Sequence, residues 1–246
     1  MTRNIFFYFL TILLSLSMQG TAVANDTFEL DQATSNITSP DKDKLNTKKV
    51  SLTKNENKIR NAAVRVMTQS GYGSGTYITL FNEDVILTAA HVIYNQKVVM
   101  VMGANSDVYV GNVIYIDITR DIAILSVPKI TSKTPVKFKQ LKEKRDNLLG
   151  DNVSYSGFPG RHDLLTIRGE IAGFEGSYII LNSYGWPGAS GSGVFNERGV
   201  YVGTLVMIDV GMFSGVAHLI EDIVWVIPSS QFNMDEIEES IRGLHN

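Results

Sequence analysis

A glycine- and serine-rich stretch near residue 190 has the composition of a catalytic turn. It reads G-A-S-G-S-G over residues 188–193 and lies between a Trp-Pro pair and an apolar segment. Glycine allows positive φ and close approach of the backbone, so a serine on such a turn can present its hydroxyl outward. Neighbouring main-chain N–H groups can then converge on an oxyanion. We predict Ser190 as a nucleophile, with the N–H groups of Gly188 and Ser190 forming the oxyanion hole.

The sequence offers a histidine and two aspartates as partners for this serine. His91 follows an apolar run and an alanine pair, and Asp121 stands directly before the apolar residues 122–125. A lone histidine is more often structural, and glycine and serine also dominate ordinary turns, so each feature alone is weak. Asp117 is the competing carboxylate. We favour Asp121 because the apolar run behind it carries it toward the interior, where it needs a partner.

The elements that must position these residues are short strands. Apolar or alternating runs recur over residues 62–127 and 153–226, separated by Gly, Pro, Asn and Asp turns, without a sustained helical period. The pattern predicts an all-β protein, either a barrel or a sandwich. One set of strands lies over residues 58–130 and carries His91 and Asp121, and a second set over residues 151–227, which carries Ser190, has the look of a second barrel.

Three other segments have distinct compositions. Residues 131–150 are basic with few apolar side chains and are predicted to link the barrels. Residues 228–246 contain an apolar stripe at helical spacing and are predicted to form a closing helix. Residues 71–75, G-Y-G-S-G, indicate a turn or bulge between strands. A phosphate-binding loop is disfavoured there, because the P-loop lysine is missing and no helical pattern follows.

The first 24 residues have the pattern of a secretory signal. Arg3 supplies a positive charge, residues 5–16 are apolar, and Ala22-Val23-Ala24 fits a cleavage site. The run is shorter than the ~20 residues of a spanning helix, so we expect an exported protein, periplasmic or secreted, without a stable membrane anchor after cleavage. Residues 25–57 are polar and aperiodic, and are predicted to be a flexible leader or pro-segment. The alternative is an arm packed across the domain.

The composition excludes several classes of function. The chain has 246 residues, of which 44% are hydrophobic and 19% are charged, as expected for a globular protein. A net charge of −3 gives no reason to expect nucleic acid as a partner. The chain has no cysteine, which rules out disulfides, thiol catalysis and thiolate metal sites.

Taken together, the motif Thr88-Ala89-Ala90-His91, the run that Asp121 opens and the stretch at residues 188–193 resemble the chymotrypsin-like (trypsin-fold) serine proteases. The likeness covers about residues 58–244 and is greatest to disulfide-free bacterial members such as HtrA-type proteases and glutamyl endopeptidases. It implies two six-stranded antiparallel β-barrels with a C-terminal α-helix. It also implies His91 as general base, Asp121 as its orienting partner and Ser190 as nucleophile, with no metal or cofactor. By the family pattern, Ser192 belongs to the turn.

The resemblance also locates a substrate pocket for proteins or peptides. The pocket is expected to be lined by Tyr184, Trp186, Leu205, Val206, Met207 and Gly215. The aspartate of trypsin-like members and the histidine of glutamyl-specific members are both missing at the corresponding positions. An apolar wall predicts a preference for small or medium apolar P1 residues. The competing functions are an inactive homologue that binds peptides in the same cleft and a chaperone-like factor, and the oligomeric state is left open.

Overall fold

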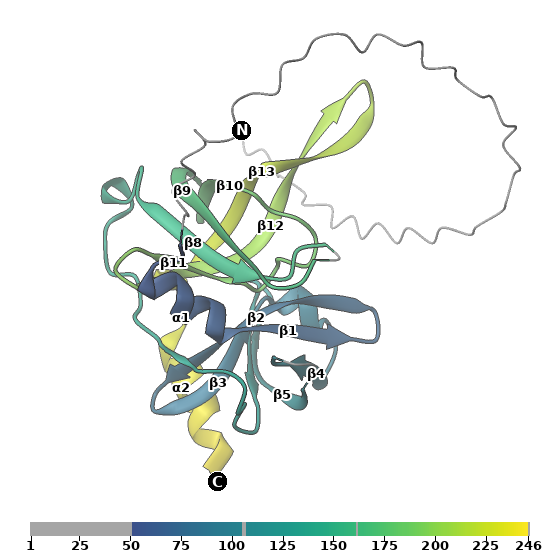
Figure 1. Ribbon diagram of the computed structural model, residues 1–246, viewed down its shortest axis with the longest axis vertical. Coiled ribbons are helices and arrows are strands. Elements are labelled where there is room, and N and C mark those ends of the chain that lie inside the picture. The colour runs from purple at the N-terminus through teal and green to yellow at the C-terminus, as the bar shows by residue number, and fades with distance from the viewer. Residues whose placement is uncertain (1–50, 105–106, 161, 246) are drawn as a thin grey trace, which may run out of the picture. The chain divides into compact units, whose positions relative to one another are not determined.

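The computed structural model describes residues 51–104, 107–160 and 162–245 (Figure 1). The predicted signal segment and the leader up to residue 50 lie outside the described residues. In the described part, most of the chain forms strands that close into two barrels, which confirms the predicted fold class. None of the helices described is long and apolar enough to cross a membrane.

The first barrel contains six antiparallel strands in the spatial order β1-β4-β5-β6-β3-β2, closed by the pairing of β1 with β2. They are β1 (Ala63–Thr68), β2 (Gly71–Leu80), β3 (Glu83–Thr88), β4 (Val98–Met102), β5 (Val108–Asp117) and β6 (Ile122–Ser126). The apolar side chains of Val64, Ile86 and Leu125 are fully buried inside it. The predicted burial of residues 122–125 behind Asp121 is therefore confirmed.

The predicted hairpin forms between β1 and β2, with Thr68 opposite Gly71, but its turn is at residues 69–70 and the segment G-Y-G-S-G belongs to the second strand. Strand β2 runs without interruption from Gly71 to Leu80. Glycine is needed here because neighbouring side chains approach the backbone closely. A Cβ on Gly73 would lie 2.5 Å from the Val92 side chain, and one on Gly75 would lie 2.7 Å from the Ile86 side chain. The glycines thus allow packing against the strand instead of bending it.

The connection between the barrels carries one short strand, β7 (Val136–Lys137), which pairs in parallel with β2. A 3₁₀ turn, η2 (Arg145–Asn147), follows it. The predicted linker is therefore partly bound to the first sheet.

The second barrel is also six-stranded and closed, in the order β10-β13-β12-β11-β8-β9. Its strands are β8 (Asn152–Gly157), β9 (Leu165–Glu175), β10 (Tyr178–Ser183), β11 (Gly193–Asn196), β12 (Tyr201–Phe213) and β13 (Val216–Pro228). Strands β12 and β13 continue beyond the barrel as a long hairpin, seen in Figure 1, and it turns at Ser214 and Gly215, both with positive φ. The register shifts twice along this pair, which separates the hairpin from the barrel walls.

A short helix, α1 (Lys54–Ala62), precedes the first barrel and contacts β2 of that barrel, the connecting strand β7, and β8 and β9 of the second barrel. A capping box starts it: the Thr53 hydroxyl accepts from the Glu56 N–H, and the Glu56 carboxylate accepts from the Thr53 N–H. Glu56 also binds the guanidinium of Arg168 on β9, with an Nη2–Oε2 distance of 2.9 Å. The flexible leader was expected to reach residue 57, whereas its last residues form the first turn of this helix.

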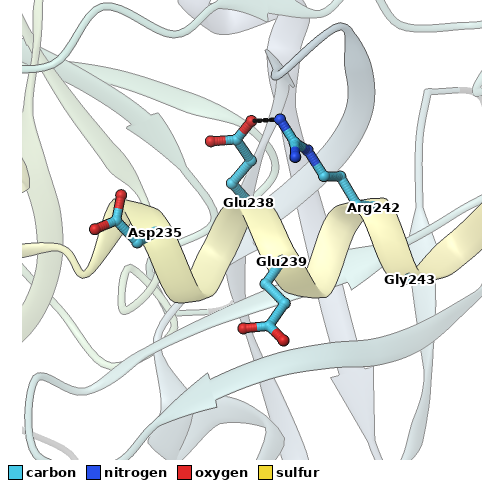
Figure 2. Close-up of a pocket in the computed structure, with 5 residues that line it drawn as sticks. All are labelled: Asp235, Glu238, Glu239, Arg242 and Gly243. Atoms are coloured by element: carbon cyan, nitrogen blue, oxygen red, sulfur yellow. Dashed lines mark hydrogen bonds and ion pairs between the residues drawn. The ribbon is translucent and has the colours of Figure 1, made fainter.

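The C-terminal helix α2 (Met234–Arg242) confirms the predicted closing helix. It follows a 3₁₀ turn, η3 (Ser229–Gln231), and ends in another, η4 (Gly243–His245). Ile237 and Ile241 are buried in the core it covers. Its outer face carries an ion pair of 2.5 Å between Glu238 and Arg242 (Figure 2).

Candidate active site

His91 and Asp121 meet at the end of the first barrel. His91 lies in the 3₁₀ turn η1 (Ala90–Ile93) directly after β3, and Asp121 precedes β6. One Asp121 oxygen is 2.6 Å from the His91 Nδ1, and the other accepts a hydrogen bond of 2.8 Å from the His91 main-chain N–H. A carboxylate only accepts, so Nδ1 carries the hydrogen and Nε2 is left as the basic nitrogen. The ring is thus fixed in one orientation, with 41% of the side chain exposed.

The backbone of Asp121 has a φ of +51°, in the left-handed region. Asp tolerates this conformation better than most residues with a Cβ, because its short polar side chain forms local hydrogen bonds. The competing carboxylate, Asp117, is taken up by an ion pair of 2.7 Å with Arg120. The structure therefore brings Asp121 to His91, and pairs Asp117 elsewhere.

The loop before β11 leaves two main-chain donors without a carbonyl partner. The N–H groups of Ala189, Gly191 and Ser192 donate within the loop or to strand β12, at 2.7 to 3.0 Å. Within the described residues, the N–H groups of Gly188 and Ser190 donate to no main-chain carbonyl. These are the two groups that the sequence predicted for the oxyanion hole.

The direction of the Gly188 N–H is fixed by a hydrogen bond to the Pro187 carbonyl, which belongs to the same peptide bond. The carbonyl of Pro187 accepts a hydrogen bond of 2.7 Å from the N–H of Gly160. In a trans peptide the C=O and N–H point in opposite directions, and the described residues contain no cis peptide. The Gly188 N–H therefore points away from Gly160. Gly188 has a φ of +101°, which favours glycine at this position.

Ser190 and His91 come from different barrels to the same place. The Ser190 carbonyl accepts a hydrogen bond of 2.8 Å from the N–H of Ser74 on β2. A Cβ on Gly73 would lie 3.0 Å from that carbonyl and 2.5 Å from the side chain of Val92, the residue after His91. The Ser190 carbonyl and the Val92 side chain therefore both lie beside Gly73 on β2.

The two serines of the loop have different environments. Ser190 is partly exposed, whereas Ser192 is fully buried and its Oγ has no hydrogen-bond partner. Only a hydroxyl open to the surface can reach a substrate, so the exposure agrees with the choice of Ser190 over Ser192.

The predicted pocket residues divide into two groups. Tyr184 is 38% exposed, Met207 is 40% exposed and Trp186 is partly exposed. The side chains of Leu205 and Val206 are buried in hydrophobic cores. Leu205 still reaches the loop through its main chain, because its carbonyl accepts from the Gly191 N–H at 2.7 Å.

Gly215 is not beside the other predicted pocket residues. It occupies the turn of the β12–β13 hairpin, ten positions after Leu205. A strand rises about 3.3 Å per residue, so the two lie roughly 30 Å apart along β12. The part of β13 that approaches the predicted pocket starts further along, where the Glu221 carbonyl accepts from the Gly185 N–H at 2.6 Å. A Cβ on Gly185 would also meet Val224 and Ile208, two apolar residues that the sequence did not single out.

A hollow on the surface lies along α2 (Figure 2). It is lined by Asp235, Glu238, Glu239, Arg242 and Gly243. It contains no serine or histidine and none of the predicted site residues. Across the described residues, no group of three His, Asp or Glu side chains is arranged to hold a metal ion.

The family model of the trypsin-like peptidase domain matches residues 73–203, a range that includes His91, Asp121 and Ser190. The chain belongs to this family. It is a serine peptidase with the chymotrypsin-like double barrel. No curated protein sequence matches the chain.

Two solved structures illustrate the likeness in fold. A serine endoprotease from Yersinia pestis is 22% identical with a TM-score of 0.61, over 78% of this chain and 68% of that one. The inactive form of the Rv3671c protease from M. tuberculosis H37Rv is 18% identical with a TM-score of 0.59, over 77% of this chain and 92% of that one. Identities this low show a shared fold alone.

Proposed function

We propose that this serine peptidase is an endopeptidase that works through His91, Asp121 and Ser190. The observation that carries the proposal is the pair of hydrogen bonds from Asp121 to the ring and the main-chain N–H of His91. The second barrel adds a loop in which the N–H groups of Gly188 and Ser190 donate to no main-chain carbonyl of the described residues. A histidine held in this way presents Nε2 as a base, and the loop supplies a nucleophile and an anion site together.

In the proposed reaction, the Ser190 Oγ attacks the peptide carbonyl while His91 Nε2 accepts its proton. Negative charge develops on the carbonyl oxygen, which the N–H groups of Gly188 and Ser190 stabilise. The imidazolium, stabilised by Asp121, returns the proton to the leaving amine as the C–N bond breaks. Water then takes the place of the amine: it gives a proton to His91 Nε2 and attacks the ester carbonyl, and His91 returns that proton to the Ser190 Oγ as the ester bond breaks and the acid product leaves.

The proposed specificity is for small or medium apolar P1 residues. Gly185 packs against Val224 and Ile208, and Met207 is exposed nearby along β12. An apolar surface offers no partner to a charged P1 side chain, whose desolvation is then uncompensated. A peptide-library profile dominated by cleavage after Arg, Lys or Glu would contradict this specificity.

Export of the protein is proposed from the sequence of residues 1–24, whose charged, apolar and A-x-A regions follow the order of a secretory signal. The proposed substrates are accordingly proteins or peptides of the periplasm or the external medium.

Labelling by a fluorophosphonate tests the activity, because the probe forms a covalent adduct only with an activated serine. The full-length protein is compared with Ser190→Ala and Ser192→Ala. Ser192 is a matched control, since it lies on the same loop but is buried without a partner. We expect labelling to be lost in Ser190→Ala alone. An unlabelled wild type would favour the inactive, peptide-binding homologue.

A further inference from the structure

Ser74 joins the two barrels at the proposed oxyanion hole. It lies on β2 in the first barrel and is fully buried. Its Oγ donates a hydrogen bond of 2.7 Å to the Gly188 carbonyl and accepts one of 2.9 Å from the Phe158 N–H. Its own N–H donates to the Ser190 carbonyl at 2.8 Å. One residue of the first barrel therefore holds three main-chain groups of the second.

These contacts act on the peptide planes that flank the Ser190 N–H. The Gly188 carbonyl belongs to the plane before Ala189, and the Ser190 carbonyl belongs to the plane after Ser190. With both planes held by Ser74, the intervening peptide, which bears the Ser190 N–H, has little freedom to rotate. Gly188 needs such a restraint, because a glycine at a φ of +101° has no Cβ to limit its conformations.

The surroundings of Ser74 are also built for this geometry. Its carbonyl accepts a hydrogen bond of 2.7 Å from the Thr88 hydroxyl, so each of its polar groups is engaged. A Cβ on Gly157 would lie 2.1 Å from the Ser192 Oγ and 2.8 Å from the Ser74 Oγ, so any larger residue there would crowd both hydroxyls. Oxyanion donors work only when they are already oriented toward the developing charge.

We propose that Ser74 is a positioning residue, which sets the orientation of the Gly188 and Ser190 N–H groups for the reaction. The inference rests on the proposed function of the loop. Ser74 does not touch the reacting atoms and acts through the peptide planes that it holds. Its removal affects the transition state, where the oxyanion exists, more than the binding of substrate.

Ser229 provides a matched control, because it is also fully buried and its Oγ makes the same two kinds of hydrogen bond. It donates to the Tyr201 carbonyl at 2.6 Å and accepts from the Leu141 N–H at 2.9 Å. These partners lie outside the loop of residues 186–192. Ser74→Ala and Ser229→Ala thus remove comparable contacts, of which only one set reaches the oxyanion hole.

The experiment measures kcat and KM of the full-length wild type and both variants on one peptide substrate. It also measures the affinity of each for a peptidyl boronic acid, whose tetrahedral serine adduct resembles the oxyanion intermediate. For Ser74→Ala we expect kcat and the boronic-acid affinity to fall about 10- to 100-fold with KM nearly unchanged, and for Ser229→Ala we expect kcat within about twofold of wild type. Equal losses in the two variants, or a loss confined to KM, would overturn the proposal.

Amide hydrogen exchange of the loop adds a readout that needs no activity. Exchange at Ala189 and Gly191 is expected to accelerate in Ser74→Ala and not in Ser229→Ala, because both amides are hydrogen-bonded in the intact loop. If the wild type takes up no fluorophosphonate, the proposed function fails while exchange still decides whether Ser74 holds the loop. Unchanged exchange in Ser74→Ala would overturn the positioning role by itself.

Discussion

Replacing Glu56 with glutamine removes the ion pair between α1 and the second barrel while keeping the helix cap. Glutamine serves as well as glutamate at this position of a capping box, so its contact with Thr53 is preserved. What is lost is the charge facing Arg168, whose guanidinium is bound at 2.5 and 2.9 Å. The variant therefore isolates the contribution of the ion pair to the free energy of unfolding.

The size of the effect follows from the carboxyl group. The hydrogen bond from Arg168 is the main reason that the pKa of Glu56 falls from 4.5 to about 2 in the folded protein. At about 1.36 kcal/mol per pKa unit, this difference corresponds to at most about 3.4 kcal/mol. The Arg168 side chain is 49% exposed, so solvent screens the pair, and we expect the variant to lose about 1–2 kcal/mol at pH 7.

The sign of the pH dependence is fixed, because the folded pKa of Glu56 lies below the unfolded one. The ion pair stabilises the protein fully above about pH 4.5, and its contribution is lost as the pH falls toward 2. Urea unfolding of wild type and Glu56→Gln at pH 7, 5, 4 and 3 measures the difference. It should stay constant from pH 7 to 5 and shrink below 4.5. A difference that is the same at every pH, or a variant as stable as wild type at pH 7, would refute the reasoning.

Two further substitutions test the site. Asp121→Asn keeps a residue that tolerates positive φ but replaces the carboxylate that fixes the His91 ring, and we expect kcat to fall by about 10⁴ with the fold retained, as steady-state kinetics and circular dichroism would show. A loss below tenfold would contradict the role of Asp121. Gly191→Ala places a Cβ 2.1 Å from the Ser74 carbonyl at a φ of +90°, so thermal unfolding should show a loss of at least about 2 kcal/mol. A stable Gly191→Ala protein would mean that the loop can move away from β2.

The strands and the candidate residues could be predicted because their signals are local. The apolar runs behind Asp121 and before His91 fit buried strands: β6 begins directly after Asp121, and β3 ends shortly before His91. Helix α1 was missed, although its capping box was visible in the spacing of Thr53 and Glu56, because nine mostly polar residues carry no clear apolar period. Its stability comes from contacts with both barrels instead.

Other features depend on residues far apart in the chain. The contact between Ser74 and Gly188 joins positions 114 residues apart, so no local pattern indicates it. Gly215 was predicted to line the pocket from the resemblance to the family, and the length of β12 and β13 could not be read from the sequence. The register shifts and the long hairpin carry it away from Leu205.

Helix α1 also limits where the chain can be processed. From the sequence, the first barrel was predicted to start at residue 58, which lies in the middle of this helix. A cut at residue 58 would remove the helix cap at Thr53 and the carboxylate of Glu56, which binds Arg168 of the second barrel. The chain has no cysteine, so no disulfide could replace this contact between α1 and the second barrel. A maturation cleavage that keeps these contacts must therefore fall on the N-terminal side of Thr53.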